Sequence, residues 1–150
     1  MEATKTRTQK VSYKKAEAVK GLELLAYEAD RLKYPTIPYV APRKFRDDTA
    51  NGLTACITAY LRLKEAFVSR LSNTGVYDTK MNKYRPTMSK KGLPDIIATY
   101  KGMSLFIEVK HGRDRMSEFQ TKIRDEQTAS GGLFFVATDF TELKKWFDNL

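Results

Sequence analysis

The sequence predicts an α/β fold, with a central mixed four-stranded sheet flanked by helices and one extra helix at the amino-terminal end. Short runs rich in β-branched and aromatic residues alternate with longer stretches whose apolar residues recur at helical spacing. After the extra helix, the predicted order is helix, strand, strand, strand, helix, strand, helix, which suits a sheet covered on both faces. A length of 150 residues, 41% apolar and 30% charged, fits a globular protein with a sizeable core.

The first 48 residues are expected to form a basic arm, a helix and a proline-rich linker, and residues 49–150 the domain that holds the sheet. Residues 1–11 are polar and are expected to be disordered. Ser12 is a candidate N-cap for a helix that reaches about Leu32, and the prolines that follow it end the helix. Three roles stay open for this third of the chain: a nucleic-acid arm, a dimer-forming helix or a cap on the core.

The second helix is predicted to begin at Asp48 or Thr49 and to reach about Ala66. Its apolar residues recur every three to four positions, which is typical of a helix that packs one face on a core. A short strand is predicted at 67–71, and a turn at 72–75 follows it.

Residues 76–91 are predicted to be a long basic loop that leads into the next strand. Loops of this length in a compact domain are often functional. Because the stretch also carries Tyr77 and Tyr84, it suits contact with a nucleic-acid backbone or stacking on an unpaired base. A surface loop with incidental lysines explains the composition comparably well.

Two β-rich runs, 95–100 and 104–109, flank Lys101-Gly102, and glycine supplies the positive φ that a two-residue hairpin loop needs. With that loop, residues whose numbers sum to 203 lie opposite each other, so Asp95 lies across from Glu108. Both faces of these strands carry apolar residues, and we therefore expect the strands to be buried on both sides.

Directly paired residues of an antiparallel ladder project from one face, about 5 Å apart, so the Asp95 and Glu108 carboxylates face each other. Lys110 is two residues beyond Glu108 and shares that face. Two facing carboxylates repel, and a divalent cation such as Mg²⁺ resolves the conflict. The lysine is placed to align or activate an attacking water, so the set suits hydrolysis of a phosphodiester. The alternative is a strand-entry aspartate and an ordinary polar pair on a half-exposed strand.

After a loop, a helix is predicted from Ser117 to about Ala129. The spacing of Ser117 and Gln120 matches a capping box, so Gln120 is expected to cap its own helix or to contact the site. A buried strand is predicted at 133–137, and Asp139 opens a final helix with an apolar stripe.

The formal net charge of +9 points to a polyanionic partner, most simply nucleic acid. Basic residues gather in sequence on both sides of the paired carboxylates, and we expect them to contact phosphates around the site: Lys80, Lys83, Arg85, Lys90 and Lys91 before it, and Arg113 and Arg115 after it.

The composition also excludes several alternatives. His111 is the only histidine, which excludes a His-based metal site, and the only cysteine, Cys56, excludes an internal disulfide. No apolar run approaches the length of a membrane span, and no signal-peptide pattern follows Met1. We therefore expect no membrane partner and a cytoplasmic location.

The sequence Gly92-Leu93-Pro94-Asp95, followed by Glu108-Val109-Lys110 and then by Gln120 on the next helix, resembles the VRR-NUC branch of the PD-(D/E)xK nuclease superfamily. The resemblance extends from about Leu53 to the carboxyl terminus, and it implies a PD-(D/E)xK nuclease-like core. It also implies a Mg²⁺- or Mn²⁺-dependent endonuclease acting on DNA. Small stand-alone members of this branch cut branched DNA such as Holliday junctions as homodimers, and a twofold dimer suits a symmetric junction.

In such a site Asp95, Glu108 and the Val109 carbonyl would hold the metal. Lys110 would align or activate the water, and Gln120 would be a secondary contact.

Relatives usually carry another acidic residue on the helix before the first strand, and this chain has none there. Asn51 or Asp48 is a candidate replacement, which leaves the choice between one and two metals open. The same departure supports an alternative from another class, a non-catalytic nucleic-acid-binding module that keeps the nuclease fold. An RNA-directed or restriction-type nuclease is a third possibility that differs only in substrate.

Overall fold

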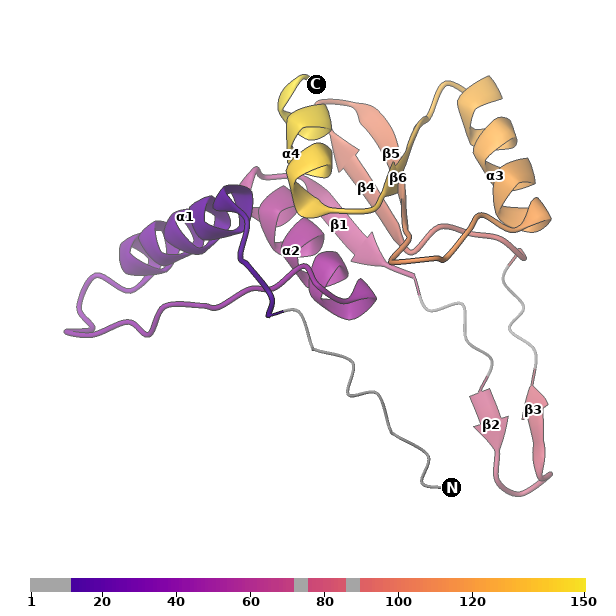
Figure 1. The fold of residues 1–150 in the computed structure, drawn as a ribbon, viewed down its shortest axis with the longest axis horizontal. Coiled ribbons are helices and arrows are strands. Elements are labelled where there is room, and N and C mark those ends of the chain that lie inside the picture. The colour runs from indigo at the N-terminus through magenta and orange to yellow at the C-terminus, as the bar shows by residue number, and fades with distance from the viewer. Residues whose placement is uncertain (1–11, 72–75, 86–89) are drawn as a thin grey trace, which may run out of the picture.

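The computed structural model describes residues 12–71, 76–85 and 90–150 of the chain (Figure 1). The disorder expected for residues 1–11 and the turn expected at 72–75 lie outside these ranges. Within these ranges, none of the helices is long and apolar enough to cross a membrane. In chain order, the elements are α1 Glu17–Lys33, α2 Ala50–Leu63, β1 Phe67–Arg70, β2 Val76–Asp78, β3 Lys83–Arg85, β4 Ile96–Tyr100, β5 Met103–Val109, α3 Glu118–Ala129, β6 Leu133–Ala137 and α4 Phe140–Asp148.

The central sheet has four strands in the order β1-β4-β5-β6. Strand β4 pairs antiparallel with β1 and β5, whereas β6 lies parallel to β5, so the sheet is mixed as predicted. A parallel pair needs a crossover connection, and α3 supplies it between β5 and β6. Figure 1 shows α3 on one side of this sheet and α1, α2 and α4 on the other, which confirms a mixed α/β fold with helices on both faces.

The main core lies between the sheet and the layer formed by α1, α2 and α4. Alternate residues of β4 and β5 point into it, and Ile96 and Ile107 among them are fully buried. Tyr60 of α2 packs edge-on against Phe140 and Phe147 of α4, with ring centroids 5.5 and 6.0 Å apart. These contacts join α2 to α4 on one face of the sheet.

Helix α1 is part of this core. Its Val19 and Leu22 belong to the same apolar cluster as α2 and the sheet. The helix begins later than the expected N-cap, Ser12, because the residues before it form tertiary contacts: the Tyr13 hydroxyl donates to Asp47 Oδ1 at 2.7 Å. Helix α1 therefore covers the core, which is one of the three roles that the sequence left open.

A second sheet lies within the stretch predicted to be a long loop. Strands β2 and β3 pair antiparallel, with Tyr77 opposite Tyr84 and Asp78 opposite Lys83. The prediction of a loop is therefore wrong for residues 76–85. Each strand has only three residues, which is too short for a period of two to be recognised in the sequence.

The predicted helix starts are otherwise close to those observed. Thr49, Ser117 and Asp139 each accept a hydrogen bond from the backbone N–H three residues further on, as N-caps do. Helix α2 ends at Leu63, before the predicted end, and Glu65 adopts a left-handed φ of 63° in the connection to β1.

Candidate active site

The turn between β4 and β5 sets the register of the site. Lys101 and Gly102 have φ values of 46° and 79°, as both central residues of a type I′ hairpin turn require. Tyr100 pairs with Met103, and Ile96 at the other end of β4 pairs with Ile107. The predicted register is therefore confirmed, and the next step along the ladder brings Asp95 to the position opposite Glu108.

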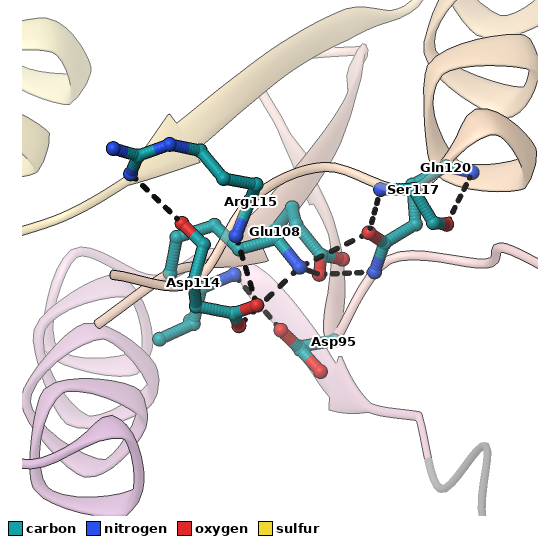
Figure 2. Close-up of polar contacts among 8 residues, drawn as sticks. Asp95, Glu108, Asp114, Arg115, Ser117 and Gln120 are labelled. Carbon is teal, nitrogen blue, oxygen red and sulfur yellow. Dashed lines mark hydrogen bonds and ion pairs between the residues drawn. The ribbon is translucent and has the colours of Figure 1, made fainter. Parts of the chain in front are cut away.

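Asp95 is fixed to both neighbouring strands. Its backbone carbonyl accepts a hydrogen bond from the Leu71 amide at 2.8 Å, and its carboxylate Oδ2 accepts one from the Val109 amide at 2.8 Å. Asp95 therefore contacts the amide of Val109, whose carbonyl is the predicted metal ligand. The carboxylate lies across the end of β5, where Figure 2 shows it beside the Glu108 side chain.

Glu108 is the most deeply buried charged residue of the site, with 2% of its surface exposed. Its Oε1 accepts a 2.5 Å hydrogen bond from Gln120 Nε2 and lies 3.0 Å from Lys110 Nζ. Its Oε2 is buried and has no hydrogen-bond partner. Burial raises the pKa of this carboxyl above its ordinary value; the Lys110 hydrogen bond opposes the shift, and the Asp95 charge adds to it.

Lys110 is also buried, with 7% of its surface exposed. Its Nζ lies 3.0 Å from Gln120 Oε1 and 3.5 Å from Asp114 Oδ2, in addition to its contact with Glu108. Burial lowers the pKa of this amine, but its bond to Glu108 and the Glu108 and Asp114 charges outweigh burial, and the net shift is upward. Lys110 is therefore held as a cation.

Gln120 has both of the roles considered for it. Its backbone amide donates to Ser117 Oγ at 3.2 Å and its Oε1 accepts from the Ser117 amide at 2.9 Å, which completes the predicted capping box. The same side chain reaches the site, where Nε2 donates to Glu108 and Oε1 accepts from Lys110 (Figure 2). The first turn of α3 therefore holds both charged residues in place.

Gly92 allows the chain before β4 to pass against this turn. Its φ is +84°, and a Cβ at this position would lie 2.4 Å from the Phe119 carbonyl carbon and 2.8 Å from the Gln120 amide nitrogen. Any side chain would therefore push the segment that leads to Asp95 away from α3. The leading glycine of the motif thus has a structural reason in this chain.

Asp114 is a site residue that the sequence did not reveal. Besides its contact with Lys110, its Oδ1 accepts a hydrogen bond from the Arg115 amide at 2.9 Å, and its carbonyl accepts one from the Arg115 guanidinium at 3.3 Å. The available signal was an acid four residues after Lys110 in an otherwise basic segment. Arg115, predicted to contact phosphate, thus lies close to the site and folds back on Asp114.

The face that carries the carboxylates is only partly covered. Toward the hairpin turn Ile97 and Phe106 are half-buried and Thr99 is exposed, so the expected burial on both sides is wrong there. At the other end of the strands, the contact between α3 and Glu108 covers the face. The site therefore lies where a covered part of the sheet meets an exposed part.

The two candidates for a further ligand each contact an arginine. Asn51 Oδ1 accepts a hydrogen bond from Arg70 at 3.0 Å, and Asp48 forms an ion pair with Arg46 that lowers the pKa of the carboxyl. In the part of the chain that the structure describes, no group of three or more His, Cys, Asp or Glu side chains is arranged to hold a metal ion. Among the described residues, Asp95 and Glu108 thus face each other without a third such side chain arranged beside them to hold a metal.

The basic residues expected around the site are divided among three places. Lys90 forms an ion pair with Glu126 of α3, and Lys91 Nζ lies 5.5 Å from the centre of the Phe119 ring, so both lie beside α3. Arg113 is exposed in the loop after Lys110. Lys80 and Lys83 are exposed on the β2–β3 hairpin, and the side chain of Arg85 lies outside the described atoms.

Comparison with protein-family models, with curated proteins and with solved structures found no match to this chain. The chemistry of the site therefore rests on its own residues. They define a site with two facing carboxylates and a buried lysine on a mixed sheet, held together by a glutamine from the neighbouring helix.

Proposed function

We propose that the protein is a Mg²⁺- or Mn²⁺-dependent endonuclease that hydrolyses DNA phosphodiester bonds, with a PD-(D/E)xK core of the VRR-NUC type. The observation that supports this most is the Glu108 carboxylate, which is 2% exposed and whose Oε2 has no hydrogen-bond partner. A buried carboxylate oxygen without a partner costs free energy unless a proton or a cation binds it.

The charges around Glu108 favour a cation. When ionised, Glu108 lies near two further carboxylates, Asp95 and Asp114, while the Lys110 ammonium contacts Glu108 and Asp114. A hard divalent ion that prefers carboxylate oxygens and keeps several waters fits this donor set, with Asp95 and Glu108 as its protein ligands. A bound Mg²⁺ would lower the pKa of a water and stabilise negative charge at the phosphate.

The residues of the chain would then have separate tasks. Lys110 stays protonated and is held by Glu108 and Gln120, so it can donate hydrogen bonds to the attacking water or to a phosphate oxygen. Gln120 fixes the orientation of both Glu108 and Lys110 from the capped end of α3. Such outer contacts tune a site without touching the reacting atoms.

The net charge of +9 and the exposed lysines support a nucleic-acid substrate that is bound mainly through its phosphates. From the resemblance, we propose branched DNA such as a Holliday junction as the substrate and a homodimer as the active form. A DNA substrate and the single, buried Cys56 fit a protein that works inside the cell.

The test is cleavage of labelled four-way junctions, linear duplex, single strands and the corresponding RNAs, with and without Mg²⁺. We expect metal-dependent cutting that is strongest on the junction. Asp95→Ala, Glu108→Ala and Lys110→Met should each lower the rate at least about 100-fold, because each removes a metal ligand or a fixed positive charge. Lys101→Met, at the far end of the same hairpin, is the matched control and should cut normally. Absence of metal-dependent cutting from every substrate would overturn the proposal.

Nucleases of the resembled branch usually carry a carboxylate on the helix before the first strand, near Ala50 or Asn51 in this chain, and its absence from the first turn of α2 favours a second candidate, a nucleic-acid-binding module without activity. The same assay separates the two, since such a module binds the junction with or without metal and leaves it intact. Binding should then be unchanged by Lys110→Met.

A further inference from the structure

The β2–β3 hairpin presents two aromatic rings to solvent. Tyr77 and Tyr84 pair across the two strands, with ring centroids 5.2 Å apart and ring planes at 66°. They remain 44% and 71% exposed. In Figure 1 the hairpin extends away from the central sheet, and its two strands pair only with each other among the described strands.

The turn of this hairpin is held by its own side chains. Asp78 Oδ1 accepts hydrogen bonds from the Lys80 amide at 2.9 Å and from the Met81 amide at 3.2 Å. Asn82 adopts a left-handed φ of 49°, and its side chain accepts a hydrogen bond from the Tyr77 hydroxyl. These contacts fix the turn locally, so the two rings are held in place before any ligand binds.

The charge around the rings is positive. Lys80 and Lys83 are exposed on the hairpin, and from residue 79 to residue 85 the sequence contains three lysines and arginines and no acidic residue. The nearest acid, Asp78, accepts the hydrogen bonds of the turn. Exposed aromatic rings within a basic segment are the combination that binds unpaired nucleotides, because bases stack on the rings and phosphates contact the lysines.

A purely structural role explains less of this arrangement. A cross-strand aromatic pair stabilises a hairpin, and an isolated two-stranded hairpin is marginal without such help. The contact between the two rings is sufficient for that structural role. The role does not explain the large exposure of Tyr84 or the lysines beside it.

We propose that the β2–β3 hairpin binds unpaired bases of the DNA substrate, with the bases stacked on Tyr77 and Tyr84 and the phosphates beside Lys80 and Lys83. This inference rests on the proposed function for the identity of the ligand, and it adds the feature that the protein recognises: unpaired nucleotides at the branch point. A perfectly paired duplex lacks that feature.

The test measures binding in EDTA, where cutting is not needed, using three labelled DNAs of equal length. One is fully paired, one contains a short run of unpaired adenines, and the third carries abasic sites in place of those adenines. The abasic DNA keeps the phosphates and loses the rings. A 2-aminopurine in the unpaired run reports stacking through the quenching of its fluorescence.

We expect the Tyr77→Ser/Tyr84→Ser double variant to lose about tenfold or more in affinity for the DNA with unpaired bases. It should lose the 2-aminopurine quenching and bind the abasic and paired DNAs as before. Tyr77→Phe/Tyr84→Phe keeps the rings and should retain most of the binding. Tyr39→Ser, at a tyrosine that is 73% exposed in the segment after α1, is the matched control and should behave as wild type.

Lys80→Gln/Lys83→Gln should weaken binding to all three DNAs and reduce the slope of log affinity against log salt by about 1.5 to 2. An equal loss on all three DNAs in the tyrosine-to-serine variant would overturn the stacking inference, and so would no loss at all. The nuclease proposal is judged separately, by cutting in Mg²⁺. If the wild type cuts DNA but the hairpin variants bind as the wild type does, only the hairpin inference is overturned. If the hairpin stacks on unpaired bases but the protein cuts none of the substrates, only the nuclease proposal is overturned.

Discussion

Gln120 shows how one side chain can link the start of a helix to the site. Its Oε1 accepts from both the Ser117 amide and Lys110 Nζ, while its Nε2 donates to Glu108. Removal of this side chain would leave Glu108 with Lys110 as its remaining polar contact. Ser117, in contrast, hydrogen-bonds to Gln120 and not to Glu108 or Lys110.

We expect Gln120→Leu to lower metal-dependent cleavage about 10- to 100-fold, because Glu108 and Lys110 lose their common partner. Ser117→Ala removes only the cap oxygen, and it should cost about 1 kcal/mol of stability with little change in cleavage. Cleavage rates at saturating Mg²⁺ and thermal unfolding separate the two effects. If both variants lose stability equally and cut equally well, Gln120 is only a cap.

The facing carboxylates could be predicted from the sequence because a two-residue turn fixes every pair of the ladder beyond it. Once Lys101 and Gly102 form the turn, counting outward pair by pair along the ladder places Asp95 opposite Glu108. Asp114 could not be predicted in this way, since it lies in an irregular loop where no period places a side chain. The dual role of Gln120 likewise depends on how α3 packs, which its own sequence does not determine.

Among the elements, α1 is fastened through Glu23. The carboxylate Oε1 accepts from Lys15 Nζ at 2.5 Å and from the Phe45 amide at 2.8 Å, which ties the residues on both sides of the helix to its centre. Burial raises the pKa of Glu23, but these hydrogen bonds and the charges of Lys15 and Lys44 outweigh burial and hold the pKa below its ordinary value of 4.5.

A carboxyl whose pKa is lowered on folding stabilises the fold when it is ionised. We therefore expect Glu23→Gln to cost about 1 kcal/mol at neutral pH. The difference from wild type should persist down to about pH 4.5 and then shrink as the pH falls through the lowered pKa of the folded state. Urea unfolding across this range measures it, with Glu28→Gln, at an exposed position of the same helix, as control. A constant difference at every pH would contradict the assignment.

The sequence predicted the elements with strong periods and missed those without them. The apolar stripe of α2 repeats over enough residues to be recognised. The β-rich runs on both sides of the turn between β4 and β5 are also long enough to be recognised. The β2–β3 hairpin has three-residue strands, and its turn depends on Asp78 and Asn82 side chains. The start of α1 was placed at Ser12 from local capping preference, whereas the structure uses Tyr13 for a tertiary contact with Asp47.

At the scale of the whole molecule, the site joins two strands of the central sheet to α3. Asp95 precedes β4, Glu108 is near the end of β5, and Gln120 belongs to the first turn of α3. Gly92 packs directly against that turn. A cation that bound the two carboxylates would therefore strengthen the connection between the sheet and α3, and its binding would be linked to global stability.

We accordingly expect Mg²⁺ to raise the melting temperature of the wild type. At 100 times the dissociation constant the linkage is worth about 2.7 kcal/mol, or roughly 5 to 10 °C for a domain of this size. Asp95→Asn should remove most of that rise. In EDTA it should be as stable as wild type or more so, because it removes a like charge beside Glu108 and keeps an acceptor for the Val109 amide.

Asp125→Asn, at an exposed carboxylate of α3, is the control and should respond to Mg²⁺ as the wild type does. Calorimetric scans at several Mg²⁺ concentrations give the measurement without any need for a substrate. An equal rise in all three proteins would mean that the ion binds elsewhere. No rise in any of them would leave the buried Glu108 oxygen to be neutralised by a proton, and the site would then lack the cation on which hydrolysis depends.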